Sequence, residues 1–225
     1  MNTQSHRTIK LITLVAMFSA LAYILALIAH FLPITIVPSV SFLKYDPKDV
    51  LICIASFILG PLYGLGISVV VSFLEMITIS STGFYGFVMN VISTCAFIIP
   101  ATLVYRQKKS FSGALISLAV GFVSALITMT LWNIIITPIY MGVERKLLIE
   151  KFLVPIIIFN AVKVGVNVAL VLLLYKPLIN ALRIVKLVDS GKSKFDFHST
   201  LIMLGIGLVL LIILIITWIL LRKYM

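Results

Sequence analysis

The sequence predicts an all-α integral membrane protein, and three observations support this fold class. Hydrophobic residues make up 62% of the 225 residues, whereas soluble domains are closer to half apolar. Only 11% of the residues are charged, which is too little polar surface for a water-soluble protein of this size. Several apolar runs reach the roughly 20 residues that a helix needs to cross a bilayer. Because backbone groups in lipid must be hydrogen-bonded, and the runs lack the alternation of a β-barrel, we expect helices.

Six helices and one further apolar run are expected. They lie at about residues 8–30, 48–60, 62–79, 84–105, 112–136 and 152–175, with the further run at 200–221. Gly60-Pro61 separates the second helix from the third, because proline removes a helical donor and clashes with the preceding turn. A single kinked helix is the alternative. The segment 31–40 contains two prolines and should be an extended loop, and the charged residues of 144–151 should form an outer loop.

Basic residues indicate the orientation, because Lys and Arg collect in cytoplasmic loops. With the N-terminus inside, the inner segments hold 10 of the 18 basic residues, namely Arg7, Lys10, Arg106, Lys108, Lys109, Lys176, Arg183, Lys186, Lys192 and Lys194. We therefore expect a multi-pass protein of the cell membrane with a cytoplasmic N-terminus. Residues 1–186 should form one transmembrane domain, 187–199 a cytoplasmic linker and 200–225 an additional transmembrane helix, whose topology stays open. The net charge of +11 fits anionic lipid faces and cytoplasmic loops better than nucleic acid.

Two charged residues are the clear cases of charge at membrane depth. Glu75 and Lys163 would each cost at least about 2.5–3.5 kcal/mol in the lipid core unless paired or facing a cavity. Glu75 either reaches water at the outer end of its helix or makes an ion pair or ligand contact. Asn160, Lys163 and Asn167 share one helix face through their spacing of three and four. This stripe should point inward, either as polar contacts between helices or as a site for a ligand with hydroxyl or carbonyl groups.

Other candidate residues are polar, aromatic or small. Asn90 and Asn133 add amides to the predicted site. Tyr45, Tyr85, Trp132 and Tyr140 lie near the proposed outer ends, where an interfacial aromatic belt is the ordinary explanation and stacking on a flat ring the alternative. Ala16 and Ala20 form a small-xxx-small pair, which would permit close approach of another helix.

Motifs of catalysis and metal binding are missing from the sequence. It contains no Walker A loop, H-E-x-x-H or G-x-S-x-G motif, and no His/Cys cluster. Cys53 and Cys95 lie in apolar runs and should be small buried hydrophobes. We therefore expect a membrane protein without catalytic residues, metal or cofactor, which would need a partner to energise transport.

Several strings, in order along the chain, resemble the substrate-binding S-components of energy-coupling factor (ECF) vitamin transporters. The resemblance is strongest to the riboflavin-specific, RibU-type branch. The strings are SFLKYDPKDV at 41–50, GPLYG at 60–64, GFYGFVMN at 83–90, Asn133 followed by TPIY at 137–140, and FNAVK at 159–163. Two features depart from the family pattern: no proline directly precedes Phe159, and the run 200–221 exceeds the six-helix plan.

This resemblance implies a six-helix bundle that serves as the high-affinity substrate-binding subunit of an ECF-type transporter. Riboflavin or FMN would be the transported ligand. Asn133, Asn160 and Lys163 would bind the flavin, with Asn90, Lys44, Tyr45 and Tyr85 as weaker candidates. The face with Ala16 and Ala20 would dock on the transmembrane coupling subunit, and two cytoplasmic ATPases would supply energy. The alternatives are an S-component for another water-soluble vitamin, a structural membrane subunit and an intramembrane enzyme.

Overall fold

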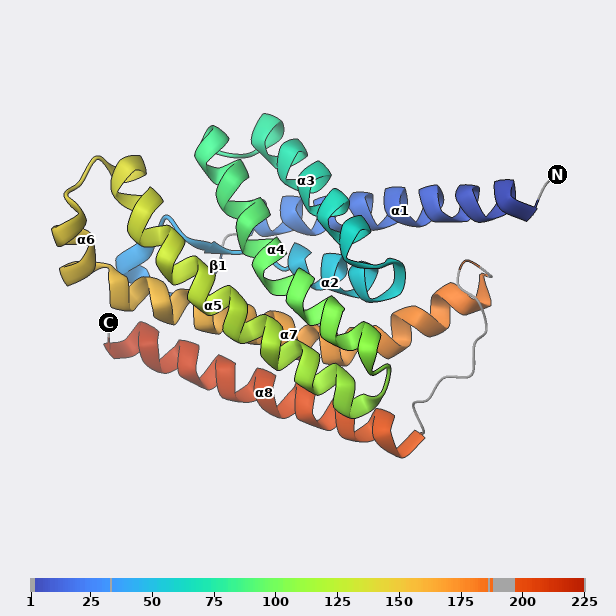
Figure 1. Ribbon diagram of the computed structural model, residues 1–225. Coiled ribbons are helices and arrows are strands. Elements are labelled where there is room, and N and C mark those ends of the chain that lie inside the picture. Colours follow the sequence, from blue (N-terminus) through green and yellow to red (C-terminus); the bar gives the residue numbers. More distant parts are fainter. Residues whose placement is uncertain (1–2, 33, 186, 188–196, 225) are drawn as a thin grey trace.

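The computed structural model describes residues 3–32, 34–185, 187 and 197–224, and it is a bundle of long helices (Figure 1). The helices are α1 (Thr3–Phe31), α2 (Lys48–Leu59), α3 (Pro61–Thr78), α4 (Gly83–Gln107), α5 (Phe111–Met141), α6 (Arg145–Lys151), α7 (Leu153–Ile184) and α8 (Phe197–Tyr224). Two short strands, β1 (Ile34–Thr35) and β2 (Lys44–Tyr45), pair antiparallel, and the 3-10 helix η1 (Pro38–Val40) lies between them. Six helices are long and apolar enough to cross a membrane, all except α2 and α6. The predicted all-α membrane class is thus confirmed.

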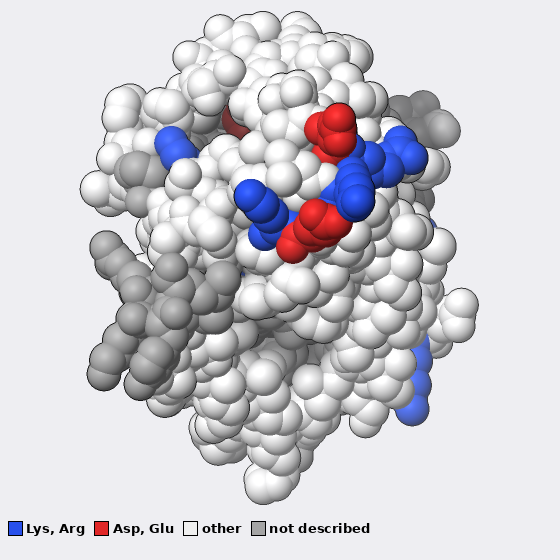
Figure 2. Space-filling view, turned by 90° about the vertical axis from the view of Figure 1, so that its left-hand side faces the viewer, with Lys and Arg blue, Asp and Glu red and all other residues white. Residues whose placement is uncertain are grey.

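The chain reverses direction so that the segments predicted to be outer and those predicted to be inner gather at opposite ends of the bundle. The strands, the α3–α4 turn, α6 and the C-terminal end of α8 lie toward the left in Figure 1, and the N-terminus of α1 lies at the right. Charged side chains of both signs gather in one band on the left-hand end, and most of the remaining surface there is uncharged (Figure 2). These features show which segments share an end of the bundle, but they do not show which end is cytoplasmic. The cytoplasmic N-terminus therefore stays a prediction.

Four details differ from the sequence-based expectations. α5 continues past residue 136 to Met141, because Pro138 costs only one hydrogen bond and the helix ends where Gly142 adopts a left-handed φ of 65°. α7 likewise continues past residue 175, through Pro177, to Ile184. The expected outer loop at 144–151 is mostly the short helix α6, and the expected loop at 31–40 contains β1 and η1. Most of the predicted linker, 188–196, lies outside the described residues.

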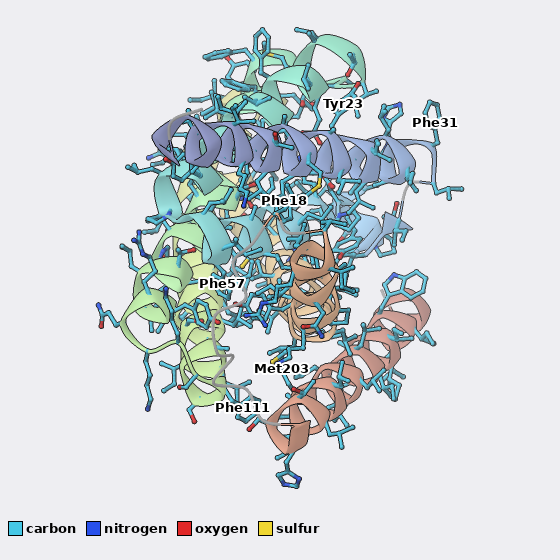
Figure 3. All side chains as sticks on the ribbon, turned by 90° about the vertical axis from the view of Figure 1, so that its right-hand side faces the viewer. Phe18, Tyr23, Phe31, Phe57, Phe111 and Met203 are labelled. Carbon is cyan, nitrogen blue, oxygen red and sulfur yellow. The ribbon has the colours of Figure 1, made fainter. Side chains whose placement is uncertain are left out.

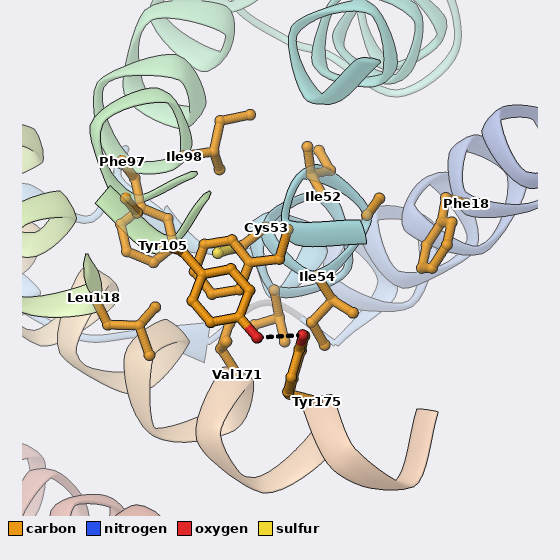
Figure 4. Close-up of a cluster of buried hydrophobic side chains, with 14 of the residues drawn as sticks. Phe18, Ile52, Cys53, Ile54, Phe97, Ile98, Tyr105, Leu118, Val171 and Tyr175 are labelled. Carbon is orange, nitrogen blue, oxygen red and sulfur yellow. Dashed lines mark hydrogen bonds between the residues drawn. The ribbon is translucent and has the colours of Figure 1, made fainter. Parts of the chain in front are cut away.

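The central element of the core is α2, which is buried on all sides. Ile52, Cys53, Ile54 and Ala55 have no exposed surface, because α2 packs against α1, α3, α4 and α7. Cys53 is therefore the buried hydrophobe that the sequence predicts, while Cys95 is half-buried. A cluster of buried hydrophobic side chains around α2 joins the bundle across helices (Figure 4).

Aromatic rings organise this cluster. The Phe57 ring of α2 stacks on Tyr105 of α4 with ring centroids 4.4 Å apart. The Tyr105 hydroxyl lies 2.6 Å from the Tyr175 hydroxyl of α7, so both phenols are satisfied inside the apolar bundle (Figure 4). α2, α4 and α7 are thereby held together on the side opposite the strands.

Gly60 makes the predicted break between α2 and α3. Its φ of 115° and ψ of 167° belong to a region that is essentially restricted to glycine. The Gly60 amide donates to the Ser56 carbonyl at 2.8 Å, which ends α2, and Pro61 begins α3. Arg106 lies close by, since its Nη1 would be 3.0 Å from a Cβ built on Gly60. The two helices can therefore meet in a sharp turn without an intervening loop.

Replacing Gly60 with alanine should destabilise the protein. We expect Gly60→Ala to lower the free energy of unfolding by about 1–3 kcal/mol, the cost of a non-glycine residue in this backbone region. Gly66→Ala is the matched control, because a Cβ at Gly66 in the interior of α3 meets no atom within 4 Å. Thermal unfolding in detergent measures both variants. Equal melting temperatures for the two would contradict this account of the turn.

Candidate functional site

A pocket opens toward the strand end of the bundle, between α4, α5, α7 and residues 42–44. It encloses about 800 Å³ including its open mouth, within the range of small-molecule sites. Its wall is formed by Phe42, Leu43, Lys44, Thr82, Tyr85, Gly86, Met89, Asn90, Ser93, Met129, Asn133, Ile136, Thr137, Tyr140, Phe159, Asn160 and Lys163. The wall thus combines apolar and aromatic surface with a few amide and ammonium groups.

The structure brings six of the seven predicted ligand residues together in this wall. Asn90 and Tyr85 come from α4, Asn133 from α5, Asn160 and Lys163 from α7, and Lys44 from β2. The seventh, Tyr45, instead lines an adjoining pocket together with Asp46 and Glu75. Lys44, Asn90 and Lys163 line both pockets, so the two share a wall.

Asn133 and Asn160 each donate an amide hydrogen to their own helix. Asn133 Nδ2 lies 2.7 Å from the Met129 carbonyl, and Asn160 Nδ2 lies 2.9 Å from the Ile156 carbonyl. The Thr137 hydroxyl donates to Asn133 Oδ1 at 2.8 Å. Such contacts to the preceding turn satisfy part of each buried amide and fix its direction, while an amide has further donor and acceptor sites. Both side chains are therefore oriented before any ligand arrives.

A buried cluster of charges lies next to the pocket and begins at the N-terminus of α2. Lys48 is 1% exposed. Its ammonium group lies 2.7 Å from Glu75 Oε1 of α3 and 2.6 Å from Asp46 Oδ2. Asn90 of α4 also donates to Glu75, at 2.9 Å. Of the two sequence-based explanations for Glu75, the ion pair is confirmed, and the carboxylate does not simply reach water.

Asp46 lies in the loop before α2, outside the membrane-spanning helices. Burial alone would raise the pKa of its carboxyl group, but the positive charges of Lys48 and then Lys163 outweigh that effect and hold the pKa below its usual value. Asp46 is therefore ionised, and Lys48 lies between two carboxylates.

Asp49, the next residue of α2, connects this cluster to α7. Its carboxylate lies 3.4 Å from the Lys163 ammonium and also 3.4 Å from the Asn167 amide. The Thr94 hydroxyl of α4 donates to Asp49 at 2.6 Å. The Tyr45 hydroxyl donates to Asn167 Oδ1 at 3.0 Å. Asp49 of α2 thus balances the positive charge of Lys163. The Lys163 side chain itself extends from α7 and lines the pocket.

Three residues of this cluster were not singled out as candidates from the sequence. Lys48 and Asp49 lie in the string SFLKYDPKDV at the start of the predicted helix 48–60, and Thr94 carries no charge to mark it within an apolar helix. The signal that could have revealed Lys48 and Asp49 was the charge balance, because Glu75 and Lys163 each require a buried partner of opposite charge.

Two tyrosines of the pocket wall lie close together. Tyr85 of α4 and Tyr140 of α5 have ring centroids 6.1 Å apart with planes tilted by 60°. Both tyrosines are exposed on one side, as residues of an interfacial belt are, and both also line the pocket. The two sequence-based explanations for these rings are therefore compatible.

Three comparisons with known proteins agree. Residues 10–175 match the family described as "ECF transporter, substrate-specific component". The riboflavin transporter FmnP of Bacillus subtilis (strain 168) is 31% identical over 135 residues, which cover 59% of this chain and 69% of FmnP. The riboflavin transporter RibU of Staphylococcus aureus (strain TCH60) is 27% identical over 193 residues, which cover 81% of this chain and 96% of RibU. A solved structure described as "Structure and mechanism of the S component of a bacterial ECF transporter" is 26% identical with a TM-score of 0.65, covering 80% of this chain and 99% of that one.

Removing the positive charge of Lys48 should destabilise the protein strongly. Lys48→Met leaves the carboxylates of Asp46 and Glu75 buried without their shared partner, which typically costs about 3–5 kcal/mol. Lys146→Met is the control, since Lys146 is exposed and lies 4.0 Å from Glu150. Thermal unfolding in detergent should show a large loss for the first variant and almost none for the second. A Lys48→Met protein as stable as the wild type would show that the cluster does not hold the fold.

Proposed function

Because the chain belongs to the family of ECF transporter substrate-specific components, we propose that it binds riboflavin in the pocket between α4, α5 and α7 for uptake across the cell membrane. Membership of this family implies association with an ECF module, which consists of a membrane subunit and ATPases. The observation that carries the ligand proposal is the convergence of Asn90, Asn133, Asn160 and Lys163, from three helices, on one pocket. The relatives named as riboflavin transporters support the same ligand.

The chemistry of the pocket suits a flavin. The isoalloxazine ring carries carbonyl oxygens and ring nitrogens along one edge, so it requires both donors and acceptors in one plane. Asparagine amides provide both, and the lysine ammonium provides a charged donor for a carbonyl oxygen or ring nitrogen. Tyr85, Tyr140 and Phe159 provide flat apolar surface for the ring. FMN would present the same ring, with its phosphate toward the open mouth.

The ion pair between Lys163 and Asp49 explains how a positively charged side chain can be buried in the bundle next to the pocket. A lone lysine at this depth would be costly, whereas Asp49 balances the charge and Thr94 and Asn167 satisfy the rest of that carboxylate. The ammonium group keeps donor capacity for a ligand, because it has three hydrogens. We propose that Lys163 binds the ring edge and that Asp49 acts through Lys163.

Ala16 and Ala20 support a docking surface for the transmembrane coupling subunit. Both alanines are exposed on α1, and they flank the buried Phe18. Ala22 and Ala26, further along α1, are instead buried in the bundle. The proposed surface is therefore narrow, and only the outward small residues permit a partner helix to approach closely.

Riboflavin binding is tested by quenching of flavin fluorescence on titration of the purified protein. We expect saturable binding, which Lys163→Ala and Asn160→Leu each weaken by about 1–3 kcal/mol, the cost of leaving a polar partner unsatisfied. Asn160→Leu keeps the side-chain bulk and leaves the Lys163–Asp49 ion pair intact, so it separates ligand contact from folding. Lys151→Ala, at an exposed site on α6, is the control. A folded wild type that ignores riboflavin would redirect the ligand to another water-soluble vitamin.

The docking surface is tested by co-purification with the coupling subunit and ATPases. Ala16→Trp and Ala20→Trp should abolish co-purification and leave riboflavin affinity unchanged, since α1 carries none of the residues lining the pocket between α4, α5 and α7. Ile127→Trp, on the exposed face of α5, is the control for bulk in the membrane. Retained co-purification in both alanine variants would place the docking surface on another helix.

A further inference from the structure

The C-terminal helix α8 lies beyond residue 175, where the match to the family ends. Most of its side chains are exposed and apolar, which suits a lipid-facing helix. One stripe faces the protein instead, with residues repeating at intervals of three and four along the helix: Met203, Gly207, Leu210, Leu214 and Trp218. Met203, at the inner end of this stripe, points from α8 into the bundle (Figure 3).

Two glycines seat α8 in a fixed register on α7. A Cβ on Gly207 would lie 2.9 Å from Leu173 Cγ and 3.1 Å from the Ala169 carbonyl oxygen. A Cβ on Gly165 of α7 would lie 3.3 Å from Leu214. At both positions the glycine backbone of one helix packs against a leucine side chain of the other, where a larger residue would crowd the contact. These contacts limit movement of α8 along α7.

This register brings the outer end of α8 to the strands. Leu214 and Trp218 pack against a buried outer cluster that includes Ile36, Val37 and Val40 of the loop between the strands. The Trp218 indole N–H donates to the Thr35 carbonyl of β1 at 3.1 Å. Trp218 is partly buried, so this hydrogen bond is partly shielded from water.

The strand that pairs with β1 belongs to the wall of the ligand pocket. Thr35 pairs with Lys44 across the two strands, and Phe42, Leu43 and Lys44 line the pocket. One strand pair therefore separates the Trp218 contact from the ligand. Among the residues that the structure describes, none of α8 lines the pocket itself, so any effect of α8 on the ligand passes through this wall.

We propose that α8 braces the loop wall of the ligand pocket and that Trp218 is a positioning residue, which slows exit of the ligand by holding β1 and with it β2. The effect on ligand exit rests on the proposed function of the pocket. The brace itself does not, because it is a property of the ligand-free protein. An S-component that ends after α7 would lack this contact and would hold its loop by the β2 side alone.

The first test is hydrogen–deuterium exchange of the ligand-free, full-length protein. Trp218→Phe keeps an aromatic ring but removes the N–H donor together with part of the indole's bulk, while Leu214→Ala removes packing one turn earlier. Each should raise amide exchange in residues 34–45 by about three- to tenfold, the effect of losing one hydrogen bond or a small packing contact. Ile216→Ala, a lipid-facing residue of the same region, is the control and should exchange like the wild type. Unchanged exchange in Trp218→Phe would overturn the brace.

The second test is stopped-flow binding of riboflavin to the same variants. Trp218→Phe should raise the dissociation rate about three- to tenfold and change the association rate and melting temperature little. If Trp218 had a merely structural role, Trp218→Phe would lower the melting temperature and leave the ratio of dissociation rate to association rate as in the wild type. That result would overturn the positioning role. If the wild type does not bind riboflavin, the proposed ligand fails, and the exchange experiment still decides the brace.

Discussion

Two consecutive residues at the start of α2, Lys48 and Asp49, enter the protein interior with opposite charges, and the rest of the structure depends on how those charges are balanced. Lys48 is balanced by Glu75 of α3 and Asp49 by Lys163 of α7. Charges at this depth persist only when paired or facing a cavity. The pairing therefore fixes α2 against α3 and α7 and places the Lys163 ammonium in the pocket wall.

The same cluster anchors the outer loop to the bundle. Tyr45 of β2 bonds to Asn167 of α7, so the β2 side of the strand pair is held by polar contacts that continue to Asp49. The β1 side is held by Trp218 at the far end of the chain. The strand pair beside the pocket is therefore held from both sides, by contacts from two different helices.

Local features were predictable from the sequence, and distant pairings were not. The break at Gly60-Pro61 and the shared face of Asn160, Lys163 and Asn167 depend only on near neighbours along the chain. The partner of Glu75 stands 27 positions earlier and the partner of Trp218 stands 183 positions earlier, and helical spacing does not say which helix faces which. Helix α6 was not predicted, because it has only 7 residues and most of them are charged. Resemblance to a known family supplied the ligand, which composition and spacing alone left open.

The central claim is that Lys163, held by Asp49, meets a flavin in the pocket between α4, α5 and α7. An experimental structure of the full-length protein purified with riboflavin tests it most directly. We expect the flavin ring within hydrogen-bond distance of Lys163 and Asn160, with the Lys163–Asp49 ion pair retained and Phe42, Leu43 and Lys44 closed over the ring. Flavin bound elsewhere, or Lys163 turned away from a ligand in the pocket, would contradict the account.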